Sequence, residues 1–165
     1  MTFAEVLLAE FDDEMAVTRR VLERAPESSF DWRPHEKSWS LGELATHLAR
    51  LPHWGTQIIE RESYDTALAG NRPTVAMGRA EMLDTFDRNV SEVRAAMTGR
   101  TDAELRAPWS LKRGTQTVLS MPRAAALQRF LLNHVVHHRG QMTVYLRIQN
   151  VRLPPIYGPT ADDRT

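Results

Sequence analysis

The sequence predicts an all-α fold, an up-down four-helix bundle whose last helix follows a long connection. Apolar residues recur at helical spacing in several long segments, and Ser/Thr-x-x-Glu capping boxes precede two of them. Proline and glycine residues separate these segments. With 165 residues and no internal repeat or linker, the chain is expected to form a single domain, residues 1–165.

The first predicted helix begins at the capping box formed by Thr2 and Glu5. Its apolar residues lie three or four positions apart until Pro26, which predicts one buried face. Residues 27–38 contain proline and serine and lose the helical spacing, so they predict a loop.

The second predicted helix has the best-marked start in the chain. Ser40 and Glu43 form a capping box, and Trp39 and Leu44 flank it at the positions of a hydrophobic staple. Pro52 lies within the apolar pattern of this helix and is expected to kink or split it.

A turn at residues 71–73 precedes the third predicted helix, residues 78–98, which Gly99 terminates. Thr101-x-x-Glu104 predicts a further short helical turn. The helical spacing then vanishes, and the connection is predicted to hold a short hairpin that pairs residues 109–111 with 116–119.

The final helix is predicted to begin between Ser120 and Pro122, because proline is favoured in a first turn. It should end near Gln149, which gives a length of roughly 40 Å at 1.5 Å per residue. Residues 153–159 contain three prolines and are expected to wrap back over the bundle.

Composition narrows the classes of protein to which the chain could belong. The 21 basic and 21 acidic residues balance, so no net charge attracts nucleic acid or an anionic membrane. The absence of cysteine excludes disulfides, thiolate ligands and a cysteine nucleophile. No segment has the length and apolarity of a membrane span or signal peptide, and we expect a cytoplasmic protein.

Histidines carry the strongest functional signal. His134 and His138 are four residues apart in the final helix, and a helical wheel places His138 about 40° from His134, within the apolar arc. His47 lies on the apolar stripe of the second helix, whereas His137 falls at the arc's edge and should face solvent or a partner. His35 is expected at the surface.

The spacing of the three inward histidines leaves two interpretations open. Each could be a buried residue with one hydrogen bond, or His47, His134 and His138 could together bind one metal ion. Val135 follows His134 where a zincin metalloprotease would have its catalytic glutamate, so that class is excluded. His53, which follows Pro52, is expected at the surface.

Gly140 predicts a second packed face on the final helix. A mid-helix glycine costs about 1 kcal/mol relative to alanine, so close packing of another helix would explain it. The neighbouring residues Val136 and Val144 are also apolar. The packing helix could belong to the bundle or to a second copy of the chain, and we favour a homodimer.

The chain resembles the DinB/YfiT-like family, also called the damage-inducible DinB family. The resemblance rests on residues 39–44 leading to His47, the run from Asn133 to Gln141, residues 145–147 and residues 157–162. It implies a four-helix bundle, often dimeric, with a divalent metal on His47, His134 and His138. Some relatives are transferases or isomerases that use a low-molecular-weight thiol.

We therefore expect the three histidines to bind one divalent transition metal ion, which could be zinc, nickel, iron or manganese. Three neutral ligands leave a coordination position for water or substrate, and Gln141 and Tyr145 are candidate supporting residues. We expect a small-molecule substrate and thiol transfer, with metal-dependent hydrolysis as the alternative. Two rivals remain: a non-catalytic metal-binding stress-response protein, and a metal-free helical dimer that acts as an interaction module.

Overall fold

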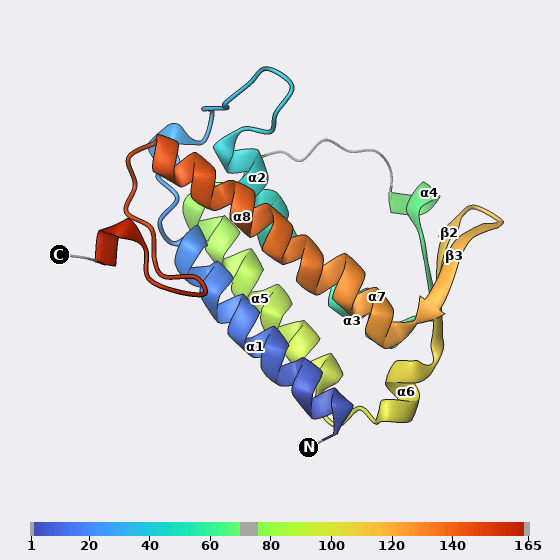
Figure 1. Ribbon diagram of the computed structural model, residues 1–165. Coiled ribbons are helices and arrows are strands. Elements are labelled where there is room, and N and C mark those ends of the chain that lie inside the picture. Colours follow the sequence, from blue (N-terminus) through green and yellow to red (C-terminus); the bar gives the residue numbers. More distant parts are fainter. Residues whose placement is uncertain (1, 70–75, 164–165) are drawn as a thin grey trace.

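The computed structural model describes residues 2–69 and 76–163 and shows four long helical segments packed as a bundle (Figure 1). These segments are α1 (Phe3–Leu22), α2 with α3 (Leu41–Arg50 and His53–Glu60), α5 (Arg79–Met97), and α7 with α8 (Arg123–Leu127 and Asn133–Ile148). Helices α1 and α8 run in one direction, and α2, α3 and α5 run in the other (Figure 1). The predicted all-α bundle is therefore confirmed, and a crossover between α3 and α5 makes those two segments parallel.

Local capping fixes the helix starts. The Thr2 and Ser40 hydroxyls each accept a hydrogen bond from the backbone N–H three residues later, at 3.2 Å. Pro52 splits the second predicted helix, so that α2 and α3 are separate. Thr101 caps the short α6 (Asp102–Arg106), whose Asp102 carboxylate accepts the N–H of Ala4 at the start of α1.

A small sheet occupies the connection before α7. Strands β2 (Pro108–Arg113) and β3 (Gln116–Pro122) form the predicted hairpin, and β1 (Ser63–Asp65) pairs parallel with β2 at its other edge. The predicted start of the final helix within residues 120–122 is wrong, because these residues complete β3. The turn predicted at residues 71–73 lies outside the described residues.

The final helix contains a π-helical segment, η2 (Gln128–Leu132), between α7 and α8. The N–H of Asn133 donates to the carbonyl of Gln128, five residues earlier, instead of to the residue four earlier. The turn that this hydrogen bond closes therefore contains one more residue than the corresponding turn of an α-helix, directly before the histidines of α8.

The interior is apolar, and Phe11 of α1, Phe86 of α5 and Trp109 of β2 are almost completely buried. The C-terminal segment passes back over the bundle as predicted, with the Tyr157 hydroxyl donating to Glu14 of α1 at 2.8 Å. No described helix combines the length and apolarity needed to cross a membrane. The remaining short elements are η1 (Glu27–Ser29), α4 (Thr66–Ala69) and η3 (Ala161–Asp163).

Candidate metal centre

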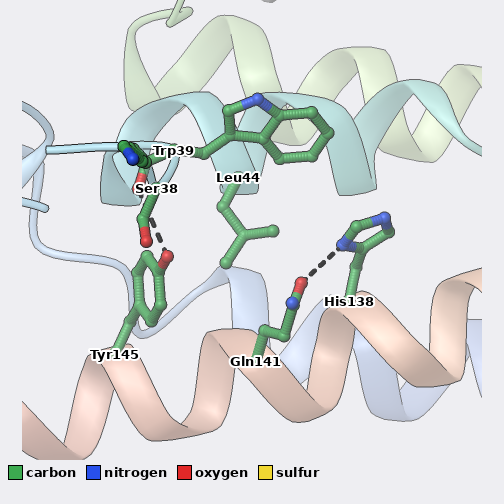
Figure 2. Close-up of a pocket in the computed structure, with 7 residues that line it drawn as sticks. Ser38, Trp39, Leu44, His138, Gln141 and Tyr145 are labelled. Carbon is green, nitrogen blue, oxygen red and sulfur yellow. Dashed lines mark hydrogen bonds between the residues drawn. The ribbon is translucent and has the colours of Figure 1, made fainter. Parts of the chain in front are cut away.

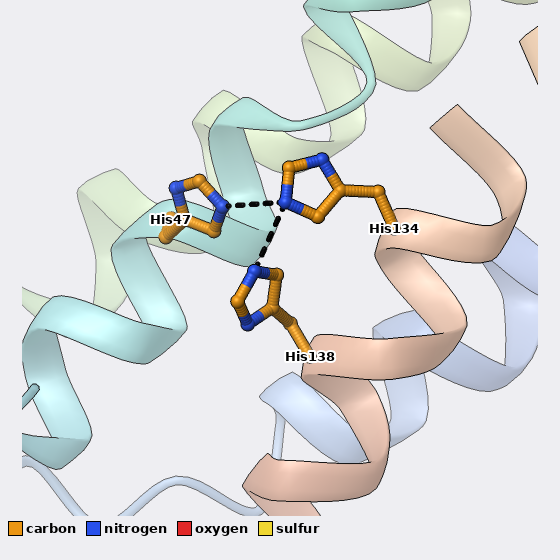
Figure 3. Close-up of side chains that lie close together, drawn as sticks. All are labelled: His47, His134 and His138. Carbon is orange, nitrogen blue, oxygen red and sulfur yellow. Dashed lines mark hydrogen bonds between the residues drawn. The ribbon is translucent and has the colours of Figure 1, made fainter. Parts of the chain in front are cut away.

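Three histidines converge between α2 and α8 (Figure 3). His47 lies in the last turn of α2, and His134 and His138 are one turn apart on α8. The Nε2 atom of His134 is 3.4 Å from Nε2 of His47 and 3.0 Å from Nε2 of His138. Within residues 2–69 and 76–163, no other group of three potential metal-ligating side chains of His, Cys, Asp or Glu comes this close together.

The packing of the two helices explains this convergence. Leu44 and Leu48 of α2 and Val135 and Met142 of α8 are almost fully buried and hold the two helices together. The histidines lie beside these residues and are half-buried, so their rings meet at the edge of the core. The sequence correctly predicted which three histidines face one another.

The donor set fits a transition metal ion. A tetrahedral site with metal–nitrogen distances of 2.0–2.1 Å requires ligand nitrogens about 3.3 Å apart. The distances from His134 to His47 and to His138, 3.4 and 3.0 Å, are close to this value, and all three ligand atoms lie within 4.8 Å of one another. Where Nδ1 carries the proton, as the hydrogen bond to Gln141 requires of His138, the Nε2 lone pairs of neutral imidazoles repel one another at these distances, whereas a shared cation would be attracted by all three. Imidazole ligands suit zinc, copper, iron or nickel better than magnesium or calcium.

Burial keeps the three imidazoles neutral. It lowers the pKa of His47 to about 3, and the neighbouring His138 and His134 lower that pKa further. Burial also lowers the pKa of His134 and of His138, although hydrogen bonds to the Phe130 backbone and to Gln141 act in the opposite direction. Each ring therefore has a lone pair available near neutral pH.

Gln141 orients one of the rings. The Nδ1–H of His138 donates to Oε1 of Gln141 at 2.7 Å, and this hydrogen bond leaves the Nε2 lone pair of His138 directed at the other histidines (Figures 2 and 3). Tyr145, the other candidate supporting residue, makes no hydrogen bond to any of the three histidines. Its hydroxyl donates to the carbonyl of Trp39 at 3.3 Å.

Trp39 covers the histidines, a role that its position in the hydrophobic staple did not reveal. Its ring is stacked against His138, with centroids 5.4 Å apart and an angle of 28° between the planes. It also packs against His47 at 4.6 Å. A tryptophan eight residues before a candidate ligand, just ahead of the helix that carries this ligand, was the available signal.

The other histidines lie where the sequence placed them. His35, His53 and His137 are exposed. Gly140 is also exposed, and a Cβ atom built there would meet nothing within 4 Å. The interpretation that another helix of the bundle packs on Gly140 is therefore wrong, whereas contact with a second copy stays a prediction.

Arg139 was missed by the sequence analysis and is only 1% exposed. It lies on the side of α8 that faces α1, where Nη1 pairs with Glu14 at 2.6 Å and Nη2 donates to the Tyr157 hydroxyl at 2.6 Å. It also donates to the hydroxyl of Thr18 at 3.2 Å. This buried network joins α8, α1 and the C-terminal segment behind the histidines.

Known proteins resemble this chain along most of its length. A curated relative, the uncharacterized protein YrdA of Bacillus subtilis strain 168, is 28% identical over 94% of this chain and 89% of its own length. A DinB-like protein from Bacillus cereus has a similar fold, with a TM-score of 0.71, 22% identity and coverage of 93% of this chain and 97% of its own. The DinB-like protein YjoA of Bacillus subtilis has a TM-score of 0.70 and 19% identity, with coverage of 93% and 99%.

At 22% and 19% identity, the two solved structures show only that the fold is similar. The family model, in contrast, compares the amino-acid sequence itself. The DinB family model matches residues 1–165. The match includes both helices that carry the histidine cluster. This chain therefore belongs to the DinB family.

Proposed function

We propose that the protein binds one divalent transition metal ion through His47, His134 and His138 and catalyses transfer of a low-molecular-weight thiol to a small electrophile. The convergence of three neutral imidazole Nε2 atoms carries the first part of this proposal. A metal ion held by neutral ligands retains its full charge and lowers the pKa of a water or thiol placed on it.

The thiol part has separate support. The chain contains no cysteine, so a reactive sulfur would have to come from a small molecule. A cavity of about 320 Å³ adjoins His138 and gives such a molecule access to the histidines. In the proposed reaction the sulfur forms a bond to an electrophilic carbon, the leaving group departs with its electron pair, and the thiol proton passes to solvent. A cytoplasmic location would keep the small thiol reduced.

The residues around the site have distinct roles in this proposal. Gln141 holds His138 in the tautomer that binds metal. Trp39 stacks on His138, packs at an angle against His47, and limits the access of water to one side of these rings. Leu44 contributes an apolar wall to the cavity.

Elemental analysis of protein purified without a histidine tag tests the metal part. We expect about one metal ion per chain, as three protein ligands and an open position would hold. Less than about a tenth of an equivalent, even after reconstitution, would contradict metal binding and favour an interaction module.

Activity assays then distinguish an enzyme from a non-catalytic metal-binding protein. Small thiols with chlorodinitrobenzene test transfer, and nitrophenyl esters test hydrolysis. Thiol-dependent turnover that requires the metal would support the proposal. Ester hydrolysis alone would favour the hydrolase, and metal binding without turnover in either assay would favour a non-catalytic metal-binding protein.

A further inference from the structure

The cavity beside His138 has a composition that selects a ligand by charge. It lies between the segment before α2 and the part of α8 that carries His138, Gln141 and Tyr145 (Figure 2). Its volume of about 320 Å³ suits a small metabolite. Seven residues form its lining: Lys37, Ser38, Trp39, Leu44, His138, Gln141 and Tyr145.

The lining offers hydrogen-bond donors and no carboxylate. Lys37 contributes an ammonium group and Ser38 a hydroxyl. The Oε1 atom of Gln141 already accepts a hydrogen bond from His138, so its NH₂ group is the part left for a ligand. A ligand rich in acceptor oxygens, with negative charge, complements such a surface.

Lys37 is the cation of this cavity and is unusual in the chain. It is one of only two lysines among 21 basic residues. All the ion pairs between described residues involve arginine, so no described carboxylate lies within 4.0 Å of the Lys37 ammonium group. The nearby Glu43 carboxylate instead accepts from the N–H of Ser40 at 2.6 Å and pairs with Arg33 at 3.6 Å. The charge of Lys37 therefore remains available to a ligand.

The cavity has two chemically different ends. His138 lies at one end and Ser38 and Tyr145 lie at the other, with the side chains of Trp39 and Leu44 between them (Figure 2). A ligand that reaches the histidines with one group would place its middle along the Trp39 and Leu44 side chains. Its far end would then lie near Ser38, which follows Lys37 in the chain.

From this arrangement we propose that the cavity binds a small molecule with a carboxylate at one end, anchored by Lys37, and a metal-binding atom such as a thiol sulfur at the other. The thiol end of this inference rests on the proposed function. The carboxylate end rests on the lining of the cavity and stands without a metal. Lys37 is thus a specificity-determining residue that selects charged over neutral ligands.

Two probes of equal length test the inference, mercaptopropionate and its neutral amide, mercaptopropionamide. Calorimetric titration of metal-loaded protein gives the ratio of the two dissociation constants. The metal ion itself favours the anionic probe, so the ratio in wild-type protein does not isolate the effect of Lys37. The change in this ratio caused by Lys37→Gln does. We expect the preference for mercaptopropionate to fall about tenfold in K37Q, as for loss of a charge-assisted hydrogen bond. The matched variant K112Q changes the chain's other lysine, in β2 far from the cavity, and should behave as wild type.

Butyrate and butyramide, titrated into metal-free protein, separate this inference from the proposed function. A preference for butyrate that disappears in K37Q supports the carboxylate anchor, whether or not the protein binds metal. An unchanged ratio in K37Q with both pairs of probes, or equal effects of K37Q and K112Q, would overturn it. Lys37 is exposed, so K37Q should fold normally, and an unchanged melting temperature verifies this.

Discussion

Gln141 lies one turn after His138, and its side-chain oxygen accepts the Nδ1–H of that histidine at 2.7 Å. This contact fixes which nitrogen of His138 carries the proton. Gln141→Leu should therefore weaken metal binding by about 10–100-fold while all three ligands remain. Competition with a metal chelator measures the change. The control Gln116→Leu, at an exposed position on β3, should bind metal as wild type does; equal losses in both variants would contradict the role of Gln141.

His138→Ala should abolish stoichiometric metal binding, because two imidazoles hold a divalent ion much less tightly than three. His137→Ala is the matched control, since His137 is the adjacent residue in the sequence but is exposed. Metal content after dialysis compares the two. Similar metal contents in the two variants would show that His138 is not a ligand.

Arg139→Leu should destabilise the fold by about 3–5 kcal/mol, since it leaves the Glu14 carboxylate, with a side chain only 13% exposed, without its partner. The double variant Glu14→Met with Arg139→Leu removes both charges and should recover much of this loss. Urea unfolding measures both. A double variant less stable than Arg139→Leu alone would show that the arginine acts through packing instead of charge.

Metal-free protein should lose stability as the pH falls from about 6.5 toward 3. Burial lowers the pKa of His47 to about 3 in the folded chain, while the unfolded chain titrates near the ordinary value of 6.5. Between about pH 3 and 6.5 the unfolded state binds a proton at His47 that the folded state does not. The stabilisation from neutral His47 is therefore fully present above about pH 6.5 and is lost as the pH falls toward 3. His47→Gln should reduce this pH dependence in urea unfolding. An identical slope in wild type and variant would contradict it.

We also predict a homodimer through the outer face of α8. Val136, Gly140, Val144 and Ile148 follow one another at intervals of four residues, and Val144 and Ile148 are 57% and 52% exposed. Val144→Glu would place a charge in this face and should produce monomers in analytical ultracentrifugation. Val118→Glu, at a valine on β3 that is 52% exposed, is the matched control. A monomeric wild type at all concentrations would exclude the dimer.

Features encoded within a few residues could be predicted from the sequence. The helix starts at Thr2, Ser40 and Thr101 each depend on a residue three positions later, and the structure shows all three capping boxes. Pro52 removes a backbone donor at its own position, which explains the break between α2 and α3. The facing histidines followed from a helical wheel because α8 is regular from Asn133 onward.

Features that depend on distant partners could not be predicted. β1 is three residues long, and only its pairing with β2, more than forty residues later, makes it a strand. An arginine beside a row of histidines is expected at the surface, and the burial of Arg139 depends on Glu14 and Tyr157. Trp39 reaches the histidines only because the segment before α2 folds across them.

The π-helical turn before α8 fits one extra residue into the final helix without changing the direction in which the following residues point, because the five residues of η2 turn through about the angle that four α-helical residues cover. Deletion of one residue between Gln128 and Leu132 should therefore restore a regular α-helix and leave His134 and His138 facing His47. Insertion of one further residue should instead rotate both histidines by about 100°, away from His47. We therefore expect evolution to tolerate a segment shorter by one residue, and to reject a longer one.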